Sequence, residues 1–290
     1  MSQPLYRDVN STGTVPSDTT IIIDAAKTSA TFKFREFWDY RELLFFLVWR
    51  QVIVRYKQTV VGILWAIMQP LVSTLVLTVV FNVFLKIESG DTPYPIFVLS
   101  GLIFWRYFSS SLALAGESLV SNAHMISKIY FPRVIIPISA CLSPMVDFFL
   151  AFIVLMVIMP FLGVLPSLRI LLIPVLLGLT FLTALSVSLW LSALNVRYRD
   201  VGQVIPFLIQ IWMYLVPVMY PIEAVSESLR PIYSLNPMVG VIEGARWILL
   251  NTDTAPDFRA MAIGLVMVLI LLVGGFFFFY RVERSFADVI

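Results

Sequence analysis

Long apolar runs separated by short charged segments dominate the chain. The first extends from Gln58 to Leu85 without a single charged residue. Because a helix needs roughly 20 predominantly apolar residues to cross a bilayer, each run of this kind is expected to form a transmembrane helix. The predicted spans cover about 61–85, 95–115, 134–160, 170–194, 201–220 and 260–280. The pattern therefore predicts an all-α polytopic membrane protein with six transmembrane helices.

Two further apolar segments, at about 221–233 and 237–250, are too short to cross a bilayer. Each is bounded by proline or by charged residues. Segments of about 10–14 apolar residues are more often re-entrant or interfacial than spanning. We therefore expect two short re-entrant helices on the outer side, between the fifth and sixth spans.

The segment before the first span predicts an amphipathic interface helix over residues 32–58. Its polar face carries Arg35, Asp39, Glu42, Arg50 and Lys57, and its apolar face carries Phe37, Tyr40, Leu44, Leu47 and Val48. A helix of this kind lies in the membrane interface. It is either a simple anchor or a docking element that faces the substrate. In the second case its basic end, formed by Arg50, Arg55 and Lys57, would contact anionic lipid head groups.

These elements divide the chain into four parts. Residues 1–31 are polar and lack the apolar core of a signal peptide, so we expect a flexible cytoplasmic tail with a short strand at Ile21–Ile23 as an option. The interface helix follows at 32–58, the six-span domain at 59–281, and a cytoplasmic C-terminal tail at 282–290.

Composition narrows the class of protein. Hydrophobic residues make up 59% of the 290 residues and charged residues 13%, whereas soluble domains carry about 25% charged residues. This balance excludes a typical cytosolic enzyme, a disordered chain and a disulfide scaffold. The chain has one Cys and one His, which makes a metal site implausible. None of its lysines follows a glycine, so the chain has no phosphate-binding loop of the G-K-[ST] type.

The distribution of basic residues predicts the orientation. Most of the 20 Lys and Arg residues lie in the N-terminal region, in the loops at about 118–133 and 195–200, and in the C-terminal tail. Basic residues are enriched in cytoplasmic loops, so these segments and both termini are expected to lie in the cytoplasm. An even number of spans agrees with this placement.

One cytoplasmic loop and three charges near membrane depth are candidate functional features. The loop is predicted to form a short helix with Asn122 as its N-cap, stopped by Pro132. It is either an ordered loop or an element that couples to a partner protein. Arg106, Glu117 and Asp147 fall in or near spans, where charges are costly. Arg106 and Asp147 either pair inside the bundle or belong to a polar conduit.

Aromatic residues are abundant and several fall within the spans. Those singled out are Trp65, Phe104, Trp105, Tyr107 and Trp212. Each either packs inside the bundle or faces lipid, or it belongs to a passage on which sugar rings could stack. Prolines at 70, 144, 174, 206 and 217 are expected to kink or shape the helices.

Five motifs are spread along the chain. They are Arg55-Tyr56-Lys57 with Gly62, Trp65 and Pro70; Gly101-Leu102 with Trp105; Asn122 through Phe131-Pro132-Arg133; Asn195 through Val201; and Pro217 through Pro221 with Asn236-Pro237 and Arg246. Together they resemble the membrane subunit of polysaccharide-exporting ABC transporters of the O-antigen export (Wzm-like) type. The resemblance extends over about 33–281 and leaves out the N-terminal tail.

The resemblance implies an assembly that composition did not show. It implies a homodimer that assembles with two separate ATPase subunits. These subunits would bind ATP and Mg²⁺. This chain itself is expected to hold no cofactor and no catalytic residue. The loop at 122–133 would be the coupling helix that docks on the ATPase. Its candidate residues are Asn122, His124, Met125, Lys128, Tyr130 and Arg133, with Arg197, Arg199 and Asp200 in the second cytoplasmic loop.

The resemblance also implies a substrate. It would be a long glycan on an undecaprenyl-diphosphate lipid, moved outward across the bacterial inner membrane through a channel between subunits. Candidate channel-lining residues are Trp65, Phe104, Trp105, Arg106, Tyr107 and Trp212, and Arg106 has no counterpart in a known family role. Asn236, Glu243 and Arg246 would belong to the re-entrant region. No nucleic-acid partner is expected.

Three alternatives stay open at this point. The cargo could be teichoic acid, capsule, a drug or a small lipid. A membrane-embedded glycosyltransferase would need clustered acidic residues at a membrane face, and only Glu117 and Asp147 are present in or near the spans. An ion-coupled carrier would keep its activity when ATP is depleted.

Overall fold

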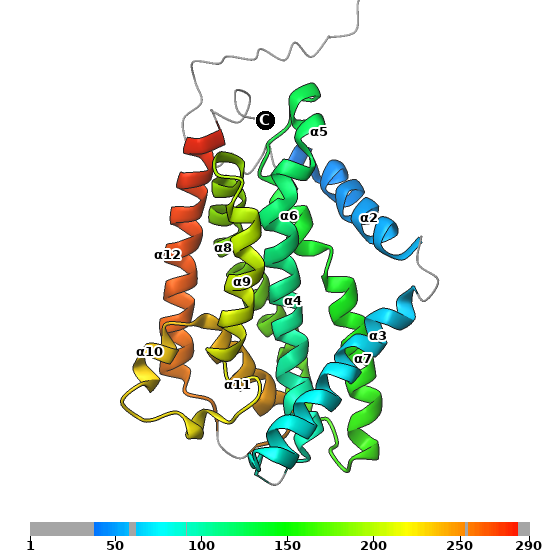
Figure 1. Ribbon diagram of the computed structural model, residues 1–290, viewed down its shortest axis with the longest axis vertical. Helices are drawn as coiled ribbons and strands as arrows, with labels where there is room; N and C mark the ends of the chain where they lie inside the picture. The colour runs from blue at the N-terminus through cyan, green and yellow to red at the C-terminus, as the bar shows by residue number, and fades with distance from the viewer. Residues whose placement is uncertain (1–37, 58–61, 91, 253–254, 284–290) are drawn as a thin grey trace, which may run out of the picture. The chain divides into compact units, whose positions relative to one another are not determined.

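The computed structural model describes residues 38–57, 62–90, 92–252 and 255–283. Throughout these ranges the ordered elements are helical, as predicted (Figure 1). The predicted tail at 1–31 and most of the one at 282–290 lie outside the described residues, as does the N-terminal part of the predicted interface helix. The last helix, α12 (Phe258–Glu283), continues two residues into the predicted C-terminal tail.

Among the residues that the structure describes, five apolar helical segments are long enough to cross a membrane. They are Leu64–Phe84, Tyr94–Ser121, Ile135–Phe161, Leu168–Arg197 and Phe258–Glu283. They match the predicted first, second, third, fourth and sixth spans. The predicted fifth span at 201–220 corresponds to α9 (Val201–Tyr214), which has 14 residues. At about 1.5 Å per residue this helix is roughly 21 Å long, so a count of six full spans stays a prediction.

Three of the five segments consist of two elements, and the fourth segment is the 3-10 helix η3 (Leu168–Leu172) followed by α8 (Ile173–Arg197). The first consists of α3 (Ile63–Leu77) followed by the π-helical turn η2 (Thr78–Phe84). The third consists of α6 (Ile135–Leu142) and α7 (Met145–Phe161), with the break at Ser143 and Pro144. Proline lacks an N–H and cannot continue the hydrogen-bond ladder of a helix, so Pro144 begins a new helix there.

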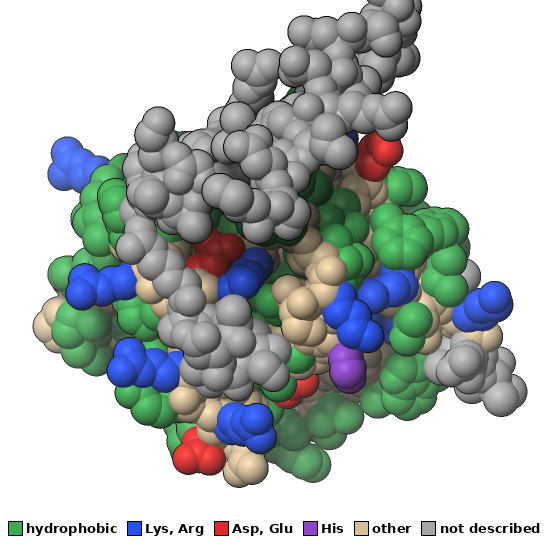
Figure 2. All heavy atoms as spheres, turned by 90° about the horizontal axis from the view of Figure 1, so that it is seen from above, with side chains coloured by type: hydrophobic (Ala, Val, Ile, Leu, Met, Phe, Trp, Pro, Cys, Tyr) green, Lys and Arg blue, Asp and Glu red, His purple; other side chains and the backbone are tan. Residues whose placement is uncertain are grey.

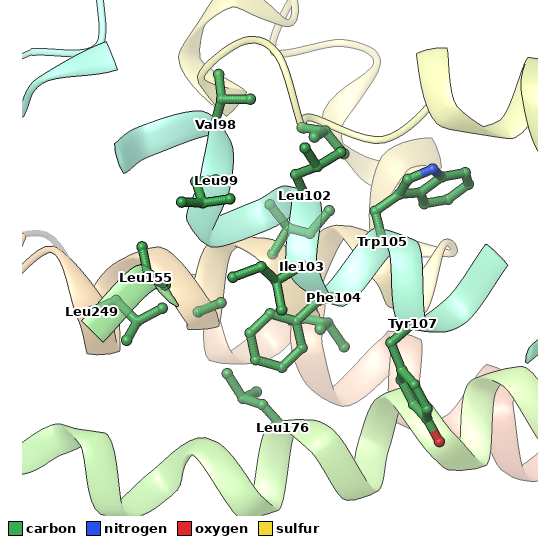
Figure 3. Packing of buried hydrophobic residues seen from close by; sticks show 14 of the residues in the cluster. Val98, Leu99, Leu102, Ile103, Phe104, Trp105, Tyr107, Leu155, Leu176 and Leu249 are labelled. Carbon is green, nitrogen blue, oxygen red and sulfur yellow. The ribbon is translucent and has the colours of Figure 1, made fainter. Parts of the chain in front are cut away.

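The helix α4 (Tyr94–Ser121) occupies the centre of the bundle. In its apolar stretch 78% of the residues are buried, against 11% for Leu64–Phe84. It packs against α6, α11 (Pro237–Leu249) and, most extensively, α8 (Ile173–Arg197), which also packs against α12. Figure 3 shows Phe104 of α4 among Ile103 and Leu176 in this core. Close approach of α9 to α4 depends on Gly116, because a Cβ there would lie 2.4 Å from Ile205 Cδ1.

The short elements after α9 agree with the predicted short segments. The η4 turn (Ile222–Ala224) and α10 (Arg230–Ser234) fall in the first, and α11 fills the second. Both α10 and α11 lie at one end of the bundle, and α5 (Ala123–Lys128) lies at the other (Figure 1). We call these the α11 end and the α5 end.

Pro217 prevents α9 from continuing, and buried Arg246 of α11 binds the carbonyls that follow. Its side chain is 4% exposed. Its Nη2 donates to Val218 O (3.0 Å) and its Nη1 to Tyr220 O (3.3 Å). The hydroxyl of Tyr94 donates to Met219 O (2.6 Å). Three successive carbonyls are thus bound by side chains, which replaces the helical hydrogen bonds that residues 218–220 would make in a longer α9.

The remaining contacts of Arg246 complete its environment. The Nη1 atom also donates to Glu243 Oε1 (2.9 Å), and the guanidinium lies 3.6 Å from the ring centroid of Phe97. A Cβ on Gly101 would lie 3.0 Å from Ile242 Cγ2 and 3.8 Å from Arg246 Nη2, so a glycine in α4 leaves room for this helix. The motif residues Gly101, Pro217–Pro221 and Arg246 therefore form one structural unit.

Replacing Arg246 with alanine is expected to loosen residues 215–221. The change leaves three acceptors, Val218 O, Tyr220 O and the Glu243 carboxylate, without their donor, and breaking a buried pair by removing one partner costs about 3–5 kcal/mol. Hydrogen exchange of the purified protein should accelerate at 215–221 and its melting temperature should fall. Arg259→Ala, at an exposed position of α12, is the control. Unchanged exchange in Arg246→Ala would contradict this role.

Candidate functional site

The interface helix α2 (Arg41–Lys57) is held to the bundle by polar side chains. Arg50 Nη2 donates to Asn122 Oδ1 (2.6 Å), and Gln51 Nε2 donates to Ser139 Oγ of α6 (3.3 Å). Its apolar residues Phe45, Phe46 and Trp49 are exposed, as expected for a helix that lies against lipid. Of the three predicted head-group residues, Arg50 and Arg55 are engaged inside the protein, and Lys57 is exposed.

Asp147, in the first turn of α7, is bound by the last turns of α2. The guanidinium of Arg55 forms an ion pair with its carboxylate, and the hydroxyl of Tyr56 donates to it. Burial and this bond to Asp147 raise the pKa of Tyr56 above its ordinary value, so the phenol stays protonated. The sequence offered Arg106 as the partner of Asp147. The direct contacts of the carboxylate are instead with Arg55 and Tyr56, because α2 packs on α6 and brings them there, and Arg106 interacts with Asp147 only electrostatically.

A cavity of about 420 Å³ lies between the end of α2 and helices α3, α4 and α7. We call it the α2 cavity. Its polar and aromatic lining comprises Arg55, Tyr56, Trp65, Gln69, Arg106, Tyr107, Ser110 and Asp147. Trp65 is 62% exposed, which places it at the mouth. The guanidinium of Arg106 contacts Ser73 Oγ at 3.4 Å.

The other predicted channel-lining aromatics are placed differently from Trp65. The side chains of Phe104, Trp105 and Tyr107 are buried within the subunit (Figure 3). Phe104 and Tyr107 pack edge-on against Phe148 of α7, with centroids 5.0 and 6.0 Å apart. Phe104 and Trp105 are therefore core residues and do not form a surface of this subunit. Trp212 of α9 is half-buried against Phe108 of α4.

Asn122 joins α4 to α5. It occupies the N-cap position of α5, yet its side chain makes no capping bond. Its Nδ2 donates back to Ser118 O (2.7 Å), and its Oδ1 accepts from Arg50. The predicted N-cap position of Asn122 is therefore confirmed, but its side-chain amide links α4 and α2 and makes no capping bond.

The α5 loop, residues 122–133, exposes a mixture of apolar and basic side chains. His124 and Lys128 are exposed, Met125 is half-buried, and Ile129 and Tyr130 are 59% and 73% exposed. Buried Ile126 and Phe131 anchor the loop in the core. Arg133 Nη1 donates to Glu283 O at the end of α12 (2.6 Å). The loop is thus ordered from within, with its exposed face available for a partner.

Figure 2 looks onto the α5 end and shows lysine and arginine side chains spread over it. Arg197, Arg199 and Asp200 are exposed on the turn that joins α8 to α9. Within the same motif, Asn195 is buried and contacts the bundle. Its Nδ2 donates to Gly116 O (3.0 Å), and a Cβ on Gly202 would lie 3.2 Å from its Oδ1.

A second cavity, of about 510 Å³, lies at the α11 end. Glu243 and Arg246 line it together with Glu88, Glu223, Arg230, Tyr233 and Asp257. Asn236 lies outside this lining and caps α11, since its side chain accepts from Met238 N. Of the three predicted re-entrant residues, Asn236 therefore caps α11, and Glu243 and Arg246 form an ion pair that lines the cavity.

Sequence reasoning missed Gln51 and Tyr56 as partners of the bundle. Tyr56 stood in the Arg55-Tyr56-Lys57 motif, so its position was a signal, but its partner lies 91 residues away. No local pattern identified Gln51 or its acceptor Ser139. The described residues contain no group of His, Cys, Asp and Glu that could hold a metal ion.

The Arg55–Asp147 pair is expected to show a measurable coupling energy. In a double-mutant cycle with Arg55→Ala and Asp147→Ala, contacting residues of this kind couple by about 0.5–3 kcal/mol. Both side chains are about a third exposed (30% and 32%), so solvent screening favours the lower part of this range. The exposed pair Arg230 and Glu227, 4.0 Å apart, is the control and should couple weakly. Equal coupling in both pairs, measured by thermal unfolding, would refute a special role for Asp147.

Comparisons with known proteins agree with this architecture. The family model described as ABC-2 type transporter matches residues 42–250. The O-antigen export system permease protein RfbA of Myxococcus xanthus is 29% identical over 258 residues, which is 88% of this chain and 98% of the relative. The protein of the same name from Klebsiella pneumoniae is 26% identical over 86% of this chain and 95% of its own length.

A more distant relative carries a different name. The polysialic acid transport protein KpsM of Escherichia coli is 23% identical over 198 residues, which is 68% of this chain and 77% of the relative. The family match runs from the second residue of α2 through α11, so it includes the α2 cavity, the α5 loop and the Arg246 contacts. This chain belongs to the ABC-2 type transporter membrane family.

Proposed function

We propose that this chain is the membrane subunit of an ATP-driven exporter of a lipid-linked O-antigen-type polysaccharide. The observation that carries the proposal is similarity to O-antigen export permeases along nearly their whole length. The family match over the described helices supports the transporter class. The substrate is proposed to be a glycan on undecaprenyl diphosphate, transported outward across the bacterial inner membrane.

ATP hydrolysis is assigned to a separate subunit that binds ATP and Mg²⁺. The chain itself has no phosphate-binding loop. The exposed face of the α5 loop, with His124, Lys128, Ile129 and Tyr130, supports docking of that subunit. Exposed aromatic and aliphatic side chains at a protein surface are typical of interfaces. In this proposal, Arg133 holds the α5 loop against the end of α12 through its hydrogen bond to Glu283 O.

The orientation proposed places the α5 end and both termini in the cytoplasm. The spread of basic side chains over the α5 end supports it (Figure 2), because cytoplasmic loops are enriched in Lys and Arg. The α11 end, with its short helices α10 and α11, then faces outward.

The assembly proposed is a homodimer with two ATPase subunits and a glycan channel between the two copies of this chain. Leu64–Phe84, the least buried of the five candidate spans among the described residues, supports this arrangement. It presents Trp65 at the α2 cavity and a row of exposed aliphatic residues beyond it, formed by Met68, Val72, Leu75, Val76, Val79 and Val83. Since Phe104 and Trp105 are buried, Trp65 is the channel-lining aromatic that the proposal retains.

Capsule export is the second candidate. It rests on the similarity to the polysialic acid transport protein, which covers less of the chain than the O-antigen relatives do. Teichoic acid and other lipid or drug cargoes, an embedded glycosyltransferase and an ion-coupled carrier have no observation of comparable weight here. Exporters of O-antigen and of capsule belong to the same transport class, so the cargo itself must be identified by experiment.

Deleting the gene is expected to leave the glycan lipid-linked on the inner face of the membrane. Surface glycan should disappear, and a plasmid copy of the unaltered chain should restore it. Immunoblots of surface glycan and extraction of lipid-linked intermediates check both results. Normal surface glycan in the deletion strain would contradict the export function.

Changing Tyr130 to alanine together with Ile129 to serine is expected to weaken the association with the ATPase subunit at least about tenfold. Removing two large exposed side chains from an interface costs roughly 1–2 kcal/mol each where they are buried by the partner. Co-purification of the ATPase with the tagged chain measures the loss. Leu168→Ser, at an exposed position near the start of η3 (Leu168–Leu172), is the control. Full co-purification of the double variant would remove the docking role.

A further inference from the structure

The α2 cavity carries an excess of positive charge. Among its described lining residues, the charged ones are Arg55, Arg106 and Asp147. Two positive charges and one negative charge leave a net charge of +1. The carboxylate directly contacts Arg55 and Tyr56 and also attracts Arg106 electrostatically, so this one anion serves both guanidinium groups.

Arg106 has few hydrogen-bond partners for a guanidinium group. A guanidinium carries five N–H donors, and the structure gives this one a single side-chain acceptor, Ser73 Oγ at 3.4 Å. That distance is at the long end for a hydrogen bond. Arg106 also lies within a candidate membrane span, where an ionised side chain is costly unless it is partnered. The described lining thus provides one carboxylate for two guanidinium groups, and a second anion in the cavity would balance the charge.

Arg55 can bind the same additional anion as Arg106. Its side chain is 30% exposed and lines the same cavity as Arg106. Guanidinium groups bind phosphate through paired, charge-assisted hydrogen bonds. A phosphate between Arg55 and Arg106 would take up the excess charge, and it would compete with Asp147 for Arg55.

The remaining lining matches a lipid better than a free ion. Ile103, Pro144, Phe148 and Ala151 give the cavity an apolar wall. Exposed Trp65 and Gln69 place its mouth on the uncovered side of α3. The volume of about 420 Å³ lies within the range of about 300–1,000 Å³ that is typical of small-ligand sites. A polar head and the start of an apolar chain can both be accommodated.

We propose that Arg55 and Arg106 bind the phosphate group of an anionic lipid in the α2 cavity. Asp147 is the internal counter-ion that holds Arg55 when the cavity is empty of lipid. This assignment rests on the proposed function in one respect, since the exporter's own substrate presents a lipid diphosphate. Ordinary phospholipids present a phosphate diester with the same chemistry, so the two sources must be separated by experiment.

The test is lipid binding to the purified full-length chain, followed by native mass spectrometry. Three probes are titrated separately: undecaprenyl diphosphate, phosphatidylglycerol and the neutral alcohol undecaprenol. The variants are Arg106→Gln, Arg55→Gln and Asp147→Asn, and Arg259→Gln at an exposed position of α12 is the control. Arg106→Lys keeps the charge and serves if Arg106→Gln does not fold.

Arg106→Gln and Arg55→Gln are each expected to weaken undecaprenyl diphosphate binding about 10- to 100-fold, the range for a charged hydrogen bond. Undecaprenol binding should not change. Asp147→Asn should tighten the binding of the phosphate lipid severalfold, because it removes the competing anion. A purely structural role for Asp147 would not produce that increase.

The probes identify the source of the phosphate. Preference for undecaprenyl diphosphate over phosphatidylglycerol, dependent on both arginines, assigns the site to the substrate head group. Equal, arginine-dependent binding of both lipids assigns it to membrane phospholipid, and the phosphate site stands. Undecaprenyl diphosphate binding that is unaffected in Arg106→Gln, Arg55→Gln and Asp147→Asn overturns the proposal. Glycan export in the Arg106→Gln strain would then separate a wrong site from a wrong function.

Discussion

Charged side chains inside an apolar bundle must find their partners within the protein, and the positions of those partners determine much of this structure. Water is not available at membrane depth to satisfy a guanidinium, a carboxylate or a free carbonyl. At the α11 end, Arg246 meets this requirement by binding the carbonyls of Val218 and Tyr220 and the carboxylate of Glu243. At the end of α2, Asp147 meets it by binding Arg55 and Tyr56.

These contacts also connect the functional parts of the chain. The helix α2 reaches the α2 cavity through Arg55 and the α5 loop through Arg50, which lie five residues apart in the sequence. Arg50 binds Asn122, and Asn122 binds back to Ser118 at the end of α4. The interface helix is therefore a polar bridge between the cavity and the α5 loop, in addition to being an amphipathic surface helix.

The helices themselves could be predicted from the apolar runs, because length and hydropathy decide whether a segment can cross a bilayer. The same pattern predicted the short helix after Asn122, the short segments at 221–250 and the approximate residue ranges of most spans. Pro217 was a local signal that α9 ends early, whereas the binding of the next carbonyls by Arg246, which lies 28 residues beyond Val218, could not be predicted. Trp65 and Phe104 were both candidates to line a channel, yet Trp65 is exposed and Phe104 is buried. Only the packing of α4 distinguishes them.

Pairing of charges was the weakest part of the sequence-based prediction. Arg106 and Asp147 were obvious partners because both are isolated charges in apolar runs, yet Asp147 is bound by a helix outside the runs. Residues that contact across 72 to 92 positions leave no local periodic signal. The excess positive charge around Arg106 could be identified only from the residues that line the α2 cavity.

The most direct test of this view is an experimental structure of the chain, in complex with its ATPase subunit and a lipid-linked glycan, in a lipid bilayer. We expect density for a phosphate group between the guanidinium groups of Arg55 and Arg106, with the Asp147 carboxylate turned away from Arg55. A cavity filled only by acyl chains, with Arg55 still paired to Asp147 while substrate is bound elsewhere, would contradict it.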